Sequence, residues 1–219
     1  MFKLLTGIVF ILLTAFVLIN LTEEEHMDWT LLYEKPLKEA MPSGFKILVE
    51  TRDPPGEIRM FRGTTKVSFS IDKVAFAISD PEARKNWVER LSDDILIDGQ
   101  PEEGEWRSYE WYNLSWPVSD REYVFSNTMK KVTDADQTQV IVTTHSIEHP
   151  DYPQRADRVR GDLPKCVYTL TQKPDSEETL VEVVVQVDPA GSLPGFLVNL
   201  IQRDWALKTL RALNGHLEK

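Results

Sequence analysis

The stretch TLVEVVVQVDPAGSLPGFLVNLIQRDWALKTLRALNG, residues 179–215, changes its hydrophobic period partway along. Over residues 179–188, Glu182 and Gln186 alternate with an apolar row made of Val181, Val183, Val185 and Val187. A strand with this pattern has one buried and one solvated face, which is typical of an antiparallel sheet rather than a doubly wound parallel one. The pattern therefore predicts an antiparallel sheet with a single core-facing side.

The second part of this stretch predicts a long amphipathic helix over about residues 192–215. Ser192 is a suitable N-cap, Pro194 fits the first turn, and Asn214–Gly215 is a typical C-cap. An apolar stripe runs along the helix through Leu197, Leu200, Ile201, Ala206, Leu207 and Leu210. The chain thus ends on a helix that has apolar surface to cover.

The region before residue 72 carries both helical and strand-like patterns. Residues 27–41 predict a short amphipathic helix whose apolar face contains Trp29, Leu32, Tyr33 and Leu37. Residues 57–63 and 64–71 alternate like two strands joined by a turn at Gly63–Thr64.

Two helices and most of the strands follow. Residues 72–80 predict a short helix, and residues 79–91 predict another with Ser79 or Asp80 as N-cap. Strand patterns then occupy residues 93–98, 105–115, 121–132, 138–147, 165–173 and 179–188. This order predicts an α+β fold: a curved antiparallel sheet wrapped around the C-terminal helix, with short helices after the first strands. The gap between such a sheet and its helix is a natural ligand cavity.

The overall composition argues against some function classes. The 219 residues carry a formal net charge of −10, whereas a nucleic-acid-binding protein needs a basic surface to meet phosphates. We therefore expect no nucleic-acid partner. The single cysteine, Cys166, allows neither an internal disulfide nor a zinc site with paired cysteines, and we expect it to be a buried free thiol.

The N-terminus differs in character from the remainder. Residues 4–21, LLTGIVFILLTAFVLINL, contain no charge and would span about 27 Å as a helix, close to the hydrocarbon thickness of a bilayer. Lys3 precedes this run and acidic residues 23–25 follow it, which predicts a main domain on the non-cytoplasmic side, the periplasm in a bacterium. We favour a transmembrane anchor over residues 1–22, with residues 23–219 as the domain. A cleaved signal peptide is the alternative.

Three segments have a recognisable form. In DPEARKNWVERLSDDILID, residues 80–98, a helix ends on Arg-x-x-Trp and runs into a strand. SWPVSDREYVF, residues 115–125, contains Trp-Pro-x-x-x-Arg-Glu, and VQVDPAGSLPGFLVNLI, residues 185–201, contains Asp-Pro-x-Gly-x-x-Pro. In this order they resemble the START domain family, the StAR-related lipid-transfer modules of the helix-grip superfamily. That family usually has aspartate at the position of Glu122. The resemblance covers roughly residues 28–216.

The resemblance implies a hydrophobic tunnel between the sheet and the C-terminal helix that holds one lipid, sterol or other apolar molecule. In this family the loop before the Arg-containing strand and the final helix form the lid. Trp116 and Pro117 would then cover the tunnel mouth, and Asp120 and Arg121 would hold the base of the loop. The candidate ligand-binding residues are Trp111, Trp116, Arg121, Tyr123, Phe125, Met129, Val183, Val185, Leu197, Leu200 and Ile201.

The residue pattern by itself leaves the role of these side chains open. The apolar ones either line a cavity or fill the core. Trp116 either covers the mouth or packs its loop onto the core. Arg121 either reaches a ligand head group or buried carboxylate, or forms a structural ion pair at the sheet edge.

No pattern typical of a catalytic or metal site is present. The sequence lacks a Gly-rich phosphate loop, a G-x-S-x-G motif and an H-E-x-x-H motif. The segment 145–151 contains two histidines and two acids, but Pro150 indicates that the strand ends there, so we expect neither a metal nor a cofactor. Glu110 and Glu182 are predicted to face outward, which would leave the cavity without an acid and predicts that the protein is not an enzyme.

We expect a monomeric domain that binds a lipid or other apolar ligand at a membrane, for transfer or sensing. Two alternatives stay open. A helix-grip enzyme acting on an apolar substrate would need a titratable group inside the cavity. An interaction module would have its core filled by its own side chains, so the presence of a cavity separates this alternative from the others.

Overall fold

The computed structural model describes residues 28–41, 44–114, 116, 118–193 and 195–219, and only the backbone in residues 195–201. Nearly all of them belong to one compact unit, Leu31–Lys219. The predicted membrane anchor, residues 1–22, lies outside the described residues. Within the described part, no helix is both long enough and apolar enough to cross a membrane.

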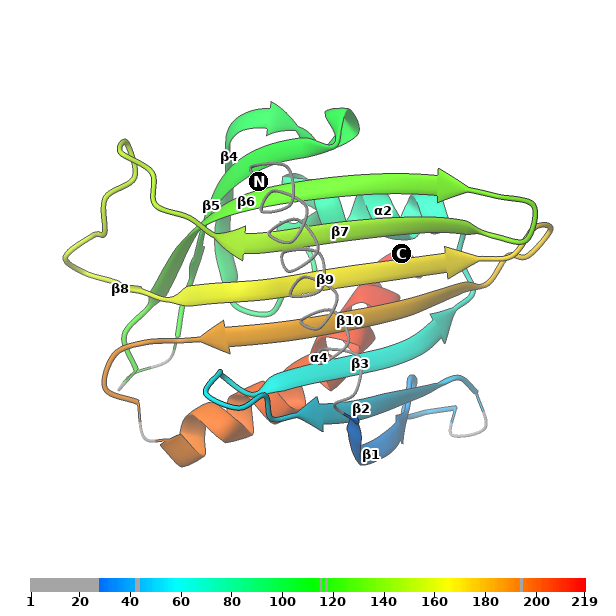
Figure 1. Ribbon diagram of the computed structural model, residues 1–219, viewed down its shortest axis with the longest axis horizontal. Coiled ribbons are helices and arrows are strands. Elements are labelled where there is room, and N and C mark those ends of the chain that lie inside the picture. Colours follow the sequence, from blue (N-terminus) through cyan, green and yellow to red (C-terminus); the bar gives the residue numbers. More distant parts are fainter. Residues whose placement is uncertain (1–27, 42–43, 115, 117, 194) are drawn as a thin grey trace, which may run out of the picture. The chain divides into compact units, whose positions relative to one another are not determined.

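A single large sheet forms the body of this unit (Figure 1). Its strands lie in the order β1-β2-β3-β10-β9-β7-β6-β5-β4, with β8 beside β6. Neighbours from β2 to β4 along this order pair antiparallel, and β8 runs parallel to β6, so the predicted antiparallel sheet is confirmed. The strands are β1 Thr30–Pro36, β2 Lys46–Arg52, β3 Met60–Val67, β4 Leu91–Gln100, β5 Glu105–Tyr112, β6 Arg121–Thr133, β7 Thr138–Ser146, β8 Val159–Arg160, β9 Asp162–Gln172 and β10 Thr179–Asp188.

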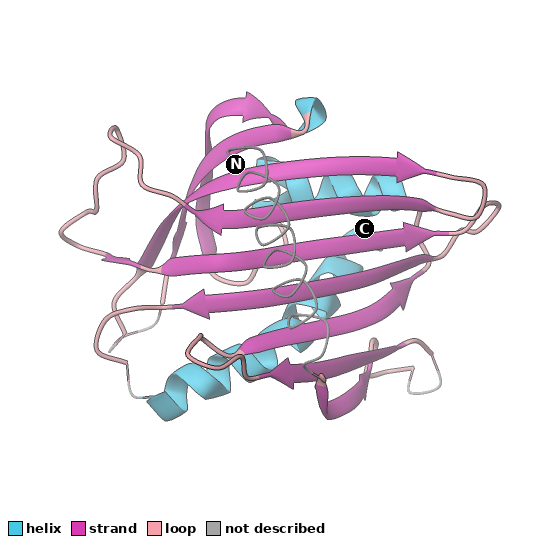
Figure 2. Ribbon diagram, viewed as in Figure 1, coloured by secondary structure: helices cyan, strands magenta, loops and turns pink. Residues whose placement is uncertain are grey.

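The helices gather on one face of this sheet (Figure 2). They are α2 Ile71–Ser79, α3 Pro81–Lys85 and α4 Gly195–Leu217, with a short 3₁₀ turn, η1, at Pro101–Glu103. Along α4, a fully buried row packs onto the sheet and consists of Ala206, Leu210, Leu213 and Leu217. A curved sheet that wraps one long C-terminal helix is the predicted helix-grip arrangement, which the structure confirms.

Gly63 lies inside a continuous strand, β3, and not at the predicted turn between two strands. A Cβ atom at this position would lie 2.9 Å from Cβ of Ala206 and 3.0 Å from Cδ1 of Leu210. Glycine is therefore required because α4 crosses the strand closely at this point, not because the chain reverses. A contact with a helix so far along the chain leaves no mark on the local hydrophobic pattern.

Residues 30–36 form an edge strand instead of the predicted amphipathic helix. Leu31 and Leu32 remain largely exposed, while the Tyr33 hydroxyl donates to the carbonyl of Arg203 on α4 at 2.9 Å. Pairing with β2 overrides the weak helical pattern of this segment. The C-terminal end also differs, because α4 continues through Gly215 to Leu217 and passes the predicted C-cap.

Asp80 sets the position of the helical segment that reaches the interior. Its backbone N–H closes α2 on the carbonyl of Phe76, and its carboxylate then caps α3 by accepting from the backbone N–H of Ala83 at 2.7 Å. The predicted cap is thus confirmed, although α3 ends at Lys85 and is shorter than predicted. This brief helix carries Arg84, whose side chain turns towards the strands β4 and β5.

Candidate ligand cavity and its buried charges

A cavity of about 510 Å³ lies within the described part of the chain, between the sheet and the part of α4 that contains Gln202, Trp205 and Thr209. This volume falls in the range of small-molecule sites, about 300–1,000 Å³. Much of its wall is apolar or aromatic and includes Trp106, Tyr123, Phe125, Val142, Tyr168 and Val185. The interior is therefore hollow at this end of the fold, which disfavours an interaction module with a filled core.

Strand register decides which residues of β5 and β6 face the cavity. Directly opposed residues share a face, and the pairs Ser108–Phe125 and Glu110–Tyr123 all line the cavity. At the end of β5 and the start of β6, the pair Tyr112–Arg121 continues the same face. Both strands therefore place polar as well as aromatic side chains in the cavity wall.

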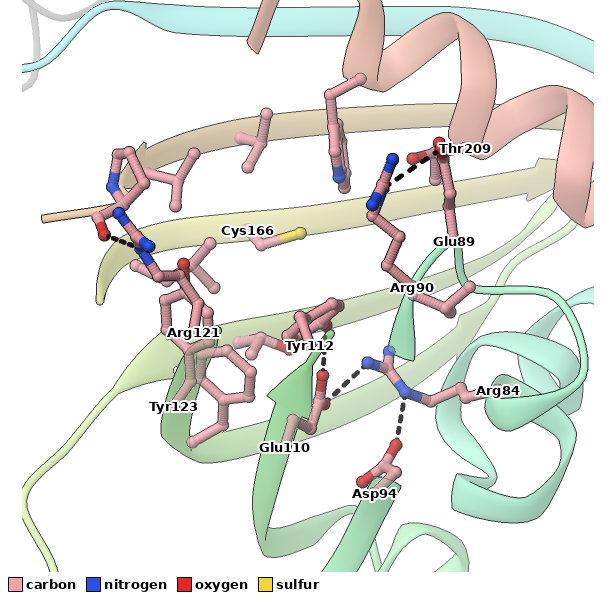
Figure 3. A pocket seen from close by; sticks show the side chains of 18 of the residues that line it. Arg84, Glu89, Arg90, Asp94, Glu110, Tyr112, Arg121, Tyr123, Cys166 and Thr209 are labelled. Atoms are coloured by element: carbon pink, nitrogen blue, oxygen red, sulfur yellow. Dashed lines mark hydrogen bonds and ion pairs between the residues drawn. The ribbon is translucent and has the colours of Figure 1, made fainter. Parts of the chain in front are cut away.

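Arg84 is the centre of a buried charge cluster in this wall (Figure 3). Its Nε donates to Oδ2 of Asp94 at 2.8 Å, and one terminal nitrogen donates to Oε1 of Glu110 at 2.7 Å. The Tyr112 hydroxyl donates to the other oxygen of Glu110 at 2.5 Å. One guanidinium therefore faces two carboxylates that are both almost completely buried, at 5% exposure for Asp94 and 2% for Glu110.

Burial raises the pKa of Glu110 to about 7, because the carboxylate loses water and only partly recovers that loss from Arg84, while Asp94 opposes ionisation further. Glu110 was predicted to face outward, and the structure corrects this. The segment 105–112 carries aromatic residues on both faces, so its hydrophobic pattern assigned Tyr109 and Trp111 to the inside. A titratable acid in a cavity of this kind is a candidate functional group.

Trp111 lies on the opposite face of β5 and is absent from the cavity wall, in contrast to the prediction. The guanidinium of Arg158 stacks over its ring, 3.9 Å from the ring centre. Arg158 also donates to the Tyr109 hydroxyl at 2.7 Å. These contacts hold the segment between β7 and β8 against the outer face of the sheet.

Arg121 links two loops that contribute to the cavity wall. Its Nε donates to the carbonyl of Pro189 at 2.7 Å, and its terminal nitrogens donate to the carbonyls of Ala190 and Ser119. Burial lowers the pKa of Arg121, yet three carbonyl oxygens replace the lost water. Asp120 completes the base of the loop by accepting from the backbone N–H of Leu114 at 2.9 Å. Arg121 thus joins the loop before β6 to the connection between β10 and α4.

The remaining predicted ligand residues divide into several environments. Arg121, Tyr123, Phe125 and Val185 lie in the cavity wall, whereas Val183 is fully buried in the core and Met129 packs against that core. Trp116 is 93% exposed, although Leu114 and Val118 of the same loop line the cavity. The side chains of Leu197, Leu200 and Ile201 lie outside the described part of the structure, as does Pro117. A ligand contact for any of these residues stays a prediction.

Sequence reasoning missed Arg84 and Asp94 as cavity residues. Arg84 stands at the start of the Arg-x-x-Trp motif in residues 80–98, which was used only to recognise the family. The motif's tryptophan, Trp87, also lines the cavity, and its indole N–H donates to the carbonyl of Ala77 at 2.8 Å. The spacing between the two motif residues was therefore the available signal that Arg84 turns inward.

Cys166 is a buried free thiol, as predicted, and the structure places it in the cavity wall. Burial raises its pKa to about 12, so the thiol stays protonated at neutral pH and is a poor nucleophile. Among the residues that the structure describes, no group of three His, Cys, Asp or Glu side chains is placed to hold a metal ion.

Comparison with known families identifies the fold and its relatives. The START domain family model matches residues 14–218. The chain belongs to the START domain family. Among curated proteins, this START domain is 26% identical over 163 residues to an uncharacterized protein of Pseudomonas aeruginosa, a match that covers 74% of this chain and 76% of that protein. It is 27% identical over 136 residues to human START domain-containing protein 10, covering 62% of this chain and 45% of the human protein.

Solved structures agree with this assignment. The human START domain-containing protein 10 superposes with a TM-score of 0.75 at 19% identity, covering 91% of this chain and 78% of that one, and shows the shared fold. A fragment of the STAR-related lipid transfer protein from Xanthomonas axonopodis superposes with a TM-score of 0.69 at 27% identity. This match covers 87% of the present START domain and 99% of the fragment.

Proposed function

We propose that this START domain binds one lipid or other apolar molecule in its cavity and carries it to or from a membrane without changing it chemically. The cavity of about 510 Å³ with a largely apolar wall is the observation that carries this proposal. A relative described as a lipid transfer protein supports the same function.

Partition into the cavity supplies the binding energy. Each methylene group moved from water into an apolar site contributes about 0.8 kcal/mol, so a ten-carbon chain contributes about 8 kcal/mol before the cost of association is subtracted. The aromatic rings of Tyr123 and Phe125, stacked with their centres 5.3 Å apart, provide apolar wall against which such a chain can pack.

The loop of residues 113–120 is the proposed contact with the membrane. Trp116 exposes a large apolar ring, while Leu114 and Val118 face the cavity from the same loop. With a net charge of −10, the chain gains nothing from the negative potential of anionic lipids, so apolar insertion is the favoured mode of docking. Ligand exchange would require the loop to separate from Pro189 and Ala190, which Arg121 now joins to it.

The apolar run of residues 4–21 is proposed to anchor the chain in the membrane, with the START domain on the non-cytoplasmic side. An anchored domain would present or pass a ligand locally instead of diffusing between distant membranes. Separation of membranes from soluble extract, followed by protease treatment of sealed vesicles, would test both the anchor and the side on which the domain lies.

Native mass spectrometry of the full chain, purified without added lipid, is the direct test of the proposed function. We expect an apolar molecule to remain bound in the native spectrum and to be released on denaturation. An unliganded mass that does not change after incubation with liposomes of mixed lipid composition would contradict the proposal.

The lid can be tested by the rate of lipid exchange with liposomes. We expect Trp116→Ala to slow exchange while leaving the unfolding midpoint unchanged, because the side chain packs against little of the fold. Phe76→Ala is the matched control, because Phe76 is also an exposed aromatic, on α2. Lys73 of that helix binds the carbonyl of Leu217, at the end of α4 remote from the mouth. Equal rates of lipid exchange in both variants would show that Trp116 has no role in the lid.

A second candidate function is catalysis on an apolar substrate. The observation that favours it is Glu110, a cavity acid whose pKa burial raises to about 7, near the value suited to general acid–base chemistry. Incubation of the native complex, followed by release and mass analysis of the bound molecule, distinguishes the two functions. An enzyme would return a molecule of altered mass in the wild type and an unaltered one in Glu110→Gln, whereas a carrier would return the same molecule from both.

A further inference from the structure

Three charged residues mark the place where the cavity meets solvent. Of the described residues in the cavity wall, only Glu89, Arg90 and Lys208 are exposed, with side chains 53%, 46% and 60% accessible. Glu89 and Arg90 lie in the turn between α3 and β4, and Lys208 lies on α4. Figure 3 shows the two residues of the turn on the α4 side of the view, away from Arg121. The cavity therefore opens between this turn and α4, and we call these three residues the rim.

The rim has an excess of positive charge, although the whole chain has a net charge of −10. Nε of Arg90 lies 3.7 Å from one carboxylate oxygen of Glu89, and Nζ of Lys208 lies 3.8 Å from the other. Neither separation is a hydrogen bond, so both cations share one carboxylate at long range. The nearby wall acid Asp204 forms its own pair with Arg203 at 3.0 Å. The three rim residues thus sum to a formal charge of plus one.

Arg90 occupies an unfavourable backbone conformation at the rim. Its φ is +64°, in the left-handed region that glycine and asparagine adopt more easily than arginine. Its carbonyl accepts from the backbone N–H of Asn113 at 3.0 Å, which fastens the turn to the start of the loop of residues 113–120. Strained backbone of this kind clusters at ligand sites. A role for the side chain of Arg90 would explain why an arginine stands at this position.

The other two cations of the described wall, Arg84 and Arg121, are already engaged inside the cavity. Arg84 holds two buried carboxylates, and Arg121 donates to three backbone carbonyls. An anion placed in the interior would also lose all of its water, whereas at the rim it keeps part of its hydration. The side chains of Trp87 and Trp205 continue the wall with apolar surface. An acidic group is therefore best placed at the rim, with apolar atoms inside.

We infer that the molecule bound in this cavity is an amphiphile with a singly charged acidic head group, such as a carboxylate, which Arg90 and Lys208 bind at the rim. This inference rests on the proposed function, since it names the head group of the same ligand. One negative charge balances the formal excess of one positive charge at the rim, whereas a phosphate monoester carries about 1.5 to 2 negative charges at neutral pH. The apolar chain lies against the aromatic and aliphatic wall.

A series of ligands that differ only in the head group tests this inference. The purified full chain is loaded with the neutral probe diphenylhexatriene, whose binding is read by energy transfer from tryptophan. Decanoate, 1-decanol and decylamine are then compared as competitors at pH 8. We expect decanoate to displace the probe at a concentration about fivefold or more below that of the alcohol, the difference that two exposed ion pairs provide. This advantage should shrink in about 0.5 M sodium chloride, because salt screens exposed charges.

Variants of the rim identify the cations responsible. Lys208→Gln and Arg90→Asn should each reduce the preference for decanoate over 1-decanol about twofold or more, and Lys208→Glu should make decylamine the better competitor. Arg90→Asn should not lower the unfolding midpoint, because asparagine tolerates the left-handed backbone. Lys66→Gln is the matched control. Lys66 is 55% exposed and lies 3.4 Å from Glu178, but it belongs to β3 and is not among the described residues of the cavity wall.

The failure of the inference and the failure of the proposed function give different results. Equal displacement by decanoate and 1-decanol in the wild type would overturn the inference, while leaving lipid binding intact. A preference for decanoate that persists unchanged in both Lys208→Gln and Arg90→Asn would also overturn it, because the acid would then bind elsewhere. If the wild type binds neither the probe nor any of the three compounds, the proposed function itself is contradicted.

Discussion

Glu110 and Glu122 lie on neighbouring strands, β5 and β6, and both are almost completely buried. They lie on opposite faces of the sheet, and their pKa values shift in opposite directions. On the outer face, Glu122 accepts from the Tyr109 hydroxyl at 2.7 Å, from Arg160 at 2.9 Å and from the backbone N–H of Arg155 at 3.0 Å. Burial raises the pKa of Glu122, but these donors outweigh it and the net pKa is lowered. On the cavity face, burial prevails and raises the pKa of Glu110 to about 7.

The difference shows that burial alone does not decide the charge of a carboxylate. Glu122 has several donors to itself, whereas Glu110 shares one guanidinium with Asp94. The outer cluster is saturated with hydrogen bonds and fastens the segment between β7 and β8, while the cavity cluster retains an unused acceptor. We therefore expect the outer cluster to contribute more to stability than the inner cluster, and Glu110 to give the inner cluster a pH dependence near neutrality.

The largest expected effect is loss of stability when Glu122 is removed. Glu122→Ala should lower the free energy of unfolding by about 3–5 kcal/mol, because it leaves Arg160 and the Tyr109 hydroxyl without their shared buried acceptor. Urea unfolding followed by circular dichroism measures this change. Glu182→Ala, on the more exposed part of the sheet, is the control and should change stability little. A loss below 1 kcal/mol in Glu122→Ala would show that the outer cluster is not structural.

The next effect is a pH dependence that comes from Glu110. Its folded pKa of about 7 lies above its ordinary value of 4.5, so between these values the folded chain holds a proton that the unfolded chain has lost. The contribution of this group to the free energy of unfolding should therefore fall as pH rises from about 4.5 to 7 and level off above 7.

Glu110→Gln should remove this part of the pH dependence. Unfolding free energies of wild type and variant, measured in urea at intervals from pH 5 to pH 8, should diverge in favour of the variant as pH rises. Parallel curves would indicate that Glu110 is ionised throughout this range and that Arg84 stabilises it more than burial destabilises it.

Glu122 should produce the opposite slope at lower pH. Because its folded pKa is lowered, its contribution to stability is fully present above the unfolded value of about 4.5 and is lost as pH falls through the folded value. The difference in unfolding free energy between the wild type and Glu122→Gln should therefore shrink on acidification below about pH 4.5. A difference that stays constant down to pH 3 would contradict the lowered pKa.

The smallest expected effect concerns Trp111. Trp111→Ala removes the stacking of Arg158, worth about 0.5–1 kcal/mol at a partly exposed site, along with some packing. Because the side chain lies on the outer face, the affinity of the cavity for a neutral, apolar fluorescent probe should be unchanged. Tyr123→Ala on the cavity face is the counterpart, and it should weaken binding. A weaker affinity for the probe in Trp111→Ala would indicate that Trp111 contributes to ligand binding after all.

The sequence predicted much of the fold because its clearest signals are local. The alternation in β10, the capping residue Asp80 and the apolar stripe of the last helix each depend on neighbours within a few residues. The segments that were predicted wrongly depend on partners far away in the sequence. Residues 30–36 become a strand only by pairing with β2, and glycine is required at position 63 because α4 approaches the strand closely there.

The site was less predictable than the fold. Arg121, Tyr123, Phe125 and Val185 were singled out and lie in the cavity wall, since each follows a clear alternation on β6 or β10. β5 offers no such guide, because Trp106 and Tyr109 place large aromatic rings on both of its faces. The inward direction of Glu110 depends on its register with Tyr123, which hydrophobicity does not encode.

By itself, the sequence determined the antiparallel sheet, the long C-terminal helix and the resemblance to the START domain family, because periodicity and short motifs are properties of adjacent residues. Only the tertiary structure decided that the interior is hollow, that Arg84, Asp94 and Glu110 meet in its wall, and that Trp111 lies outside it. The physical reason is that desolvation and charge pairing depend on which side chains from separate elements share a volume, and that volume exists only after the sheet has closed on α4.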